Sequence, residues 1–118
     1  MPAKLKLEHP VLIALLLALA VAAVYLPVAQ FDFTNYADTY YVTRNPQVLP
    51  GLSWEGVRWA FTQGYSANWH PVTWLSHMLD CQIYGLKAGG HHLTSLLLHA
   101  VNTALVFLVL RSLTGAVW

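Results

Sequence analysis

The chain has little charge and almost no cysteine. Only 9% of its 118 residues are charged, whereas a soluble domain carries about 25% charged residues. The formal net charge of +1 gives no basic field that would indicate nucleic acid as a partner. The single cysteine, Cys81, excludes an intramolecular disulfide, and no zinc-ligand spacing is present, so no metal site is predicted. A hydrophobic content of 57% instead indicates an integral membrane protein or part of one.

Two long apolar runs predict an all-α membrane protein with transmembrane helices at residues 10–30 and 91–113. The run from Pro10 to Ala29 has 20 residues without a charge, which matches a hydrocarbon core of about 30 Å. A cleaved signal peptide is the competing interpretation, but its apolar region should span only about 7–15 residues. The length of the run therefore favours a membrane anchor.

The distribution of positive charge predicts the orientation of the chain. Lys4 and Lys6 precede the first run, and Arg111 lies near the end of the second. Positive residues tend to stay in the cytoplasm. We therefore expect residues 1–9 and 114–118 to be cytoplasmic, with the loop 31–90 on the periplasmic or extracellular side.

This loop of about 60 residues contains two predicted amphipathic helices, near 53–62 and 71–84. Ser53 is a candidate N-cap, Pro71 suits a first helical position, and Gly85 can end the second helix. Each helix has an apolar stripe at helical spacing. In the first helix it is formed by Trp54, Val57 and Phe61, and in the second by Val72, Leu75 and Leu79, widened by Trp74 and Met78. Four of the five tryptophans lie in this loop. Such helices are expected at the lipid headgroups, with "KAGGHH" as a flexible hinge into the second span.

One face of the second span is polar. His92, Ser95, His99 and Asn102 recur at steps of three, four and three, and therefore share a helix face. Polar groups at membrane depth usually face other helices or a cavity. We expect this face to pack against further transmembrane helices of the same or another polypeptide, which is the commoner use of such histidines. Ligation of a metal, haem or chlorophyll by His91, His92 or His99 is the alternative, and the sequence leaves any cofactor unknown.

The few acids of the loop are the candidates for chemistry. Asp38 follows the first span, where an acid can act as a general base on an incoming hydroxyl or amine. The simpler interpretation is a solvated loop carboxylate. His77 and Asp80 stand three residues apart on a predicted helix and can pair.

Four segments of the chain resemble the N-terminal region of a bacterial family. They are "NYADTYYVTRNPQV", "LSWEGVRWAF", "NWHPVTWLSHMLDCQIYGL" and "GHHLTSLLLHAVNTALVFLVLRSLTG". The family comprises multispanning proteins with C-terminal tetratricopeptide repeats, related to the transmembrane-and-TPR O-mannosyltransferases. Its members are similar to GT-C glycosyltransferases. The resemblance covers about residues 31–118.

The resemblance implies a bacterial inner-membrane enzyme with a non-cytoplasmic active site and a polyprenyl-phosphate sugar as donor. It implies that Asp38 is the catalytic acid or base and that Asn35, Tyr36 and Tyr41 bind substrate. The family usually has two consecutive acids where this chain has Ala37 and Asp38. The missing acid argues against metal binding or a paired-carboxylate mechanism in this stretch, while Asp38 alone can serve as the base.

Two hypotheses follow for the function. In the first, the chain is the N-terminal part or a truncated relative of a GT-C-like glycosyltransferase, because two helices cannot enclose both a lipid-linked donor and an acceptor. In the second, it is a non-enzymatic accessory subunit of a larger membrane complex. A complex that contains pigment or haem is one form of this hypothesis. The first predicts loss of sugar transfer when Asp38 is replaced, and the second predicts stable partner chains.

Overall fold

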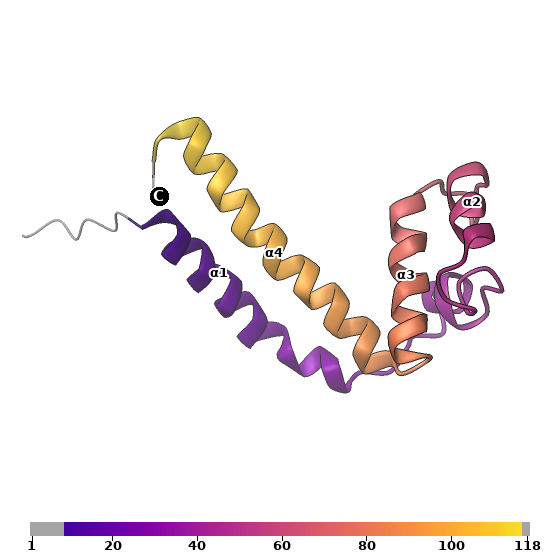
Figure 1. The fold of residues 1–118 in the computed structure, drawn as a ribbon. Helices are drawn as coiled ribbons and strands as arrows, with labels where there is room; N and C mark the ends of the chain where they lie inside the picture. Colours follow the sequence, from indigo (N-terminus) through magenta and orange to yellow (C-terminus); the bar gives the residue numbers. More distant parts are fainter. Residues whose placement is uncertain (1–8, 117–118) are drawn as a thin grey trace, which may run out of the picture. The chain divides into compact units, whose positions relative to one another are not determined.

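The computed structural model describes residues 9–116. All the regular elements in this part of the chain are helices. The elements in order are α1 (Pro10–Tyr25), the 3₁₀ helix η1 (Leu26–Gln30), the π-helical turn η2 (Thr39–Thr43), α2 (Trp54–Thr62), α3 (Pro71–Tyr84) and α4 (Ala88–Thr114) (Figure 1). Within the described residues no strand forms. The all-α prediction is confirmed. The predicted cytoplasmic ends fall largely on residues 1–8 and 117–118, which lie outside the described residues.

The chain divides into two compact units. The first, here called the span unit, consists of the chain up to Pro27 together with the chain from Ser95 onward. The second, here called the loop unit, runs from Val28 to Thr94 and therefore includes the first turns of α4. All the candidate residues of the loop lie in this second unit.

The span unit contains the long apolar helices. The segments Pro10–Gln30 and Ala88–Thr114 are each long and apolar enough to cross a membrane, as the sequence predicts. Within the span unit α1 and α4 run in opposite directions (Figure 1). Their large side chains are mostly exposed, for example Leu19 and Leu113, an arrangement suited to lipid rather than to water. The first span tightens into η1 around Pro27, because proline lacks the N–H that an α-helix needs.

The second span begins earlier than predicted. Helix α4 starts at Ala88 rather than at His91, so Gly89 and Gly90 are helical and the predicted flexible hinge does not exist. A side chain at Gly90 would overlap the ring of Tyr84, and one at Gly89 would overlap the carbonyl of Ala29. Glycine is used here because neighbouring segments approach the helix backbone closely.

The two short helices of the loop are capped as predicted. Ser53 Oγ accepts a hydrogen bond from the Gly56 N–H at 2.9 Å. This N–H lies in the first turn of α2 and has no acceptor within the helix. Pro71 occupies the first turn of α3, where its missing N–H costs nothing. Gly85 ends α3 with φ of 61°, a conformation that favours glycine.

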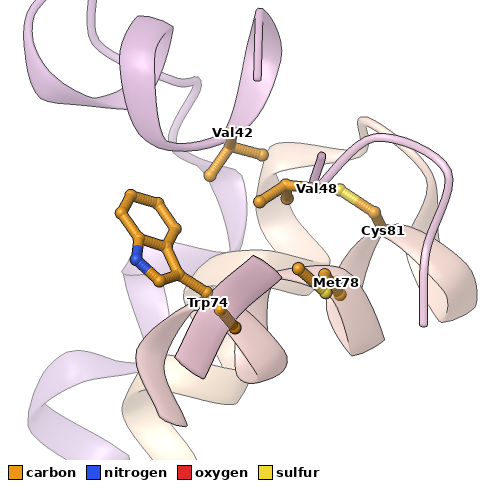
Figure 2. Close-up of a cluster of buried hydrophobic side chains, with 6 residues drawn as sticks. Val42, Val48, Trp74, Met78 and Cys81 are labelled. Atoms are coloured by element: carbon orange, nitrogen blue, oxygen red, sulfur yellow. The ribbon is translucent and has the colours of Figure 1, made fainter. Parts of the chain in front are cut away.

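The helices α2 and α3 pack together around one buried cluster. Its members come from η2, from the following turn and from both helices, and they are Val42, Val48, Ala60, Trp74, Met78 and Cys81. Figure 2 shows this cluster and labels all but Ala60, with Trp74 at one side. The loop therefore has its own hydrophobic core.

Only part of the predicted apolar stripe of α3 is buried in this core. Val72 is 72% exposed and Leu79 is 43% exposed, whereas Trp74 and Met78 are fully buried. The segment that carries Val42 and Val48 covers the Trp74 side, so the larger side chains are the ones removed from water.

In α2 the small residues Gly56 and Ala60 are buried, while the predicted stripe residue Trp54 is 78% exposed. A Cβ at Gly56 would lie 3.1 Å from Met78 Sδ, so a small residue is what allows the close approach of α3.

Candidate functional site

Asp38 lies at the start of η2 and is held by its own turn. Its Oδ2 accepts hydrogen bonds from the Thr34 N–H at 2.8 Å and from Thr34 Oγ1 at 3.2 Å. The side chain is half-buried rather than fully solvated. Because both hydrogen bonds go to Oδ2, Oδ1 is the oxygen that can accept a proton from an incoming group.

The residues proposed to bind substrate lie in two different environments. Asn35 is exposed, and Tyr36 is 84% exposed. Tyr41 instead packs on the core, with its ring centroid 4.9 Å from that of Trp74 and an interplanar angle of 27°. The Tyr41 hydroxyl accepts a hydrogen bond from Asn68 Nδ2 at 2.8 Å. Tyr41 therefore packs against Trp74, whereas Asn35 and Tyr36 lie at the surface.

The rings of two histidines, His70 and His77, lie near the ring of Trp74. The His70 ring centroid lies 4.7 Å from that of Trp74, and the His77 centroid lies 6.4 Å from it. Three buried ring nitrogens here have no hydrogen-bond partner among the described residues: His70 Nε2, Trp74 Nε1 and His77 Nδ1. In Figure 2 the indole nitrogen of Trp74 points away from Met78 and Cys81. Orphaned polar atoms of this kind are rare and often mark functional sites.

His77 connects Asp38 to this region electrostatically. Burial lowers the pKa of His77 below its ordinary value of 6.5, although the Asp80 and Asp38 carboxylates each act to raise it. The neighbouring His91 and His70 act in the same direction as burial. A neutral imidazole can accept a proton or bind a metal ion.

A third side chain lies close to His77 and Asp80, and helical spacing within α3 does not predict it. His91, in the first turn of α4, places its Nδ1 3.9 Å from Asp80 Oδ2. His77, Asp80 and His91 each offer one ligand atom, and these atoms all lie within 4.8 Å of one another. Asp80 and His91 are only 4% and 5% exposed. The sequence indicated the pairing of His77 with Asp80 and, separately, His91 as a possible ligand, but not that the two would meet, because His91 approaches from another helix.

The polar face of α4 is divided between the two units. In the loop unit, His92 Nε2 donates a hydrogen bond to the Asp32 carbonyl at 3.2 Å. In the span unit, the His99 ring meets the Tyr25 ring edge-on with centroids 5.3 Å apart. Ser95, His99 and Asn102 are exposed. These residues share one face of α4, as the spacing predicts.

The loop unit thus holds one anchored carboxylate, Asp38, beside a group of histidines and a buried acid. No family model, no curated protein and no solved structure matches this chain.

Proposed function

We propose that this chain supplies the first external loop of a GT-C-like glycosyltransferase of the bacterial inner membrane, with a polyprenyl-phosphate sugar as donor. The observation that carries the proposal is the state of Asp38. Its carboxylate is half-buried and oriented by Thr34. The Asp38 charge also acts to raise the pKa of His77. The motif resemblance assigns the same residue to catalysis.

The reaction follows from the free Asp38 oxygen. Asp38 Oδ1 takes the proton from the acceptor hydroxyl as the hydroxyl oxygen attacks C1 of the donor sugar. The bond between C1 and the phosphate oxygen breaks, and polyprenyl phosphate leaves with the bonding electrons. A positioned general base of this kind typically contributes about 10²–10⁴-fold to the rate.

The connectivity of the loop unit supports a donor bound at the membrane surface. The unit follows directly on the apolar segment Pro10–Gln30 and continues directly into Ala88–Thr114. Asp38 follows Gln30, the end of the first apolar segment, by eight residues, so the chain length limits how far Asp38 can lie from the headgroups, where the phosphate of a lipid-linked sugar lies. The positive charges of Lys4 and Lys6 before the first span support the prediction that this side is opposite the cytoplasm.

The test is sugar transfer by membranes that contain the protein in its full natural length. The donors are undecaprenyl-phosphate mannose, glucose and galactose, each labelled in the sugar, and the readout is label in the acceptor fraction. Asp38→Asn should lower transfer by about 10²–10⁴-fold. Asp32→Asn is the matched control, because Asp32 is an exposed acid of the same loop. Undiminished transfer by Asp38→Asn, or no transfer by the wild type from all three donors, would overturn the proposal.

A second candidate function is an accessory subunit of a larger membrane complex. The observation that favours it is the exposure of His99 and Asn102 on a helix apolar enough to span the membrane. Such side chains need partner helices, or a pigment or haem, in the bilayer. Purification in mild detergent decides this: co-purifying chains that are lost in His99→Leu with Asn102→Leu favour the subunit. A pigment-free protein without partners excludes it.

A further inference from the structure

We propose that His77, Asp80 and His91 bind one divalent transition-metal ion, with zinc as the ion that fits best. The site lies in the loop unit, where it joins α3 to the first turn of α4. Two imidazoles and one carboxylate form a set that leaves a fourth position for water. The proposal does not depend on the glycosyltransferase function, because its test needs no sugar donor.

The positions of the ligand atoms are close to those that zinc requires. Bonds of about 2.1 Å in a tetrahedral site place ligand atoms about 3.4 Å apart. Here the atoms lie within 4.8 Å of one another, and the His91–Asp80 distance is 3.9 Å. Small side-chain rotations close this difference. A distance of 3.9 Å is too long for a hydrogen bond, so the geometry suits two ligands of one ion.

The groups behind the ligands hold them in the orientation that metal sites use. His91 Nε2 donates to the Gly85 carbonyl at 2.7 Å. A carbonyl can only accept, so the neutral ring keeps its lone pair on Nδ1, the atom that faces Asp80. Metal-binding histidines characteristically donate their other N–H to a carbonyl or carboxylate in this way.

Asp80 is oriented from its other oxygen. Its Oδ1 accepts a hydrogen bond from Thr94 Oγ1 at 2.7 Å, while Oδ2 is the oxygen that faces His91. Hydrogen bonding of a ligating carboxylate is the usual arrangement in metal sites. His77 completes the set with one of its ring nitrogens. Its Nδ1 is buried and has no hydrogen-bond partner among the described residues. An ion pair between Asp80 and a protonated His91 is the competing explanation, and it would leave His77 unused.

The test uses the full chain in detergent micelles, stripped with a chelator, loaded with zinc chloride and dialysed. Elemental analysis should find about one zinc per chain, and cobalt in its place should give the visible absorption of a four-coordinate site. His77→Gln should weaken zinc binding by more than about 100-fold, and Thr94→Val, which keeps all three ligands, by about 10–100-fold. His9→Gln is the matched control, because His9 is exposed and lies in the span unit.

Thr94→Val keeps the test valid if replacement of a buried ligand prevents folding. Equal zinc retention by wild type, His77→Gln and Thr94→Val would overturn the proposal. So would a wild type that retains no zinc, which is the result expected of an ion pair alone.

Discussion

The Tyr41 ring stacks on the Trp74 ring with centroids 4.9 Å apart. This contact joins the turn that begins at Asp38 to the helix that carries His77 and Asp80. The stacked pair therefore fixes the candidate base relative to the histidines. Aromatic pairs of this kind contribute about 0.5–1.5 kcal/mol beyond the area that they bury.

Removal of the central tryptophan should unfold the loop unit. Trp74 is fully buried, and Trp→Ala in a core costs about 3–5 kcal/mol, a large part of the stability of a small domain. Thermal unfolding of the full chain in detergent, followed by near-ultraviolet circular dichroism, should show this loss for Trp74→Ala. Trp54→Ala should change stability by less than about 0.5 kcal/mol, because Trp54 is 78% exposed. Similar losses for both variants would contradict the described core.

The single thiol should be protected by the fold. Burial raises the pKa of Cys81, and the neighbouring Asp80 carboxylate raises it further. At pH 8 alkylation by iodoacetamide should be at least about tenfold slower than in the SDS-unfolded chain, because the thiolate is the reactive species. The folded state retains its proton more strongly, so this linkage stabilises the fold below the ordinary thiol pKa. The contribution is lost as the pH rises through the folded value. Equal alkylation rates in both states would refute the burial.

The glycines at the start of α4 should resist substitution. A Cβ at Gly90 would lie 2.8 Å from Tyr84 Cβ and would also overlap the ring. Gly90→Ala should therefore destabilise the loop unit by about 1–3 kcal/mol, the usual cost of overpacking. Gly64→Ala serves as the control, because its nearest neighbour, the Asn68 carbonyl, is 3.6 Å away. Chemical denaturation of both variants in micelles checks the difference, and a stable Gly90→Ala would mean that the two segments are not in contact.

The cap of α2 should have a measurable but smaller effect. Ser53→Ala removes the acceptor of the Gly56 N–H and should cost about 1 kcal/mol. Ser53→Asp replaces the hydroxyl acceptor by a carboxylate oxygen and should retain most of the stability. Both are measured by thermal unfolding. A loss in Ser53→Asp as large as in Ser53→Ala would show that the cap itself is not the source of the effect.

Features encoded by neighbouring residues could be predicted from the sequence. Ser53, Pro71 and Gly85 mark helix ends through their own backbone chemistry, and the structure places all three as expected. The start of the second span was harder to predict. Gly89 and Gly90 lower helix propensity, but close neighbours make glycine the residue that fits there.

The candidate site was predicted only in part. Asp38 was identified from its position after the first span and from the motif, and the structure adds the hydrogen bonds from Thr34. The pairing of His77 with Asp80 follows from helical spacing. The approach of His91 does not, because it depends on how the chain reverses at Gly85 between α3 and α4.

The sequence by itself determined the two apolar helices and the capped ends of the short helices, because hydrophobic length and capping are local properties. Only the tertiary structure decided which part of the apolar stripe of α3 is buried: Trp74 and Met78 lie in the core, whereas Val72 and Leu79 remain exposed. Periodicity defines the possible faces of a helix, but the segment that covers it selects the buried one. Here that segment carries Val42 and Val48, about 30 residues away in the chain. The same folding brings His91 to Asp80.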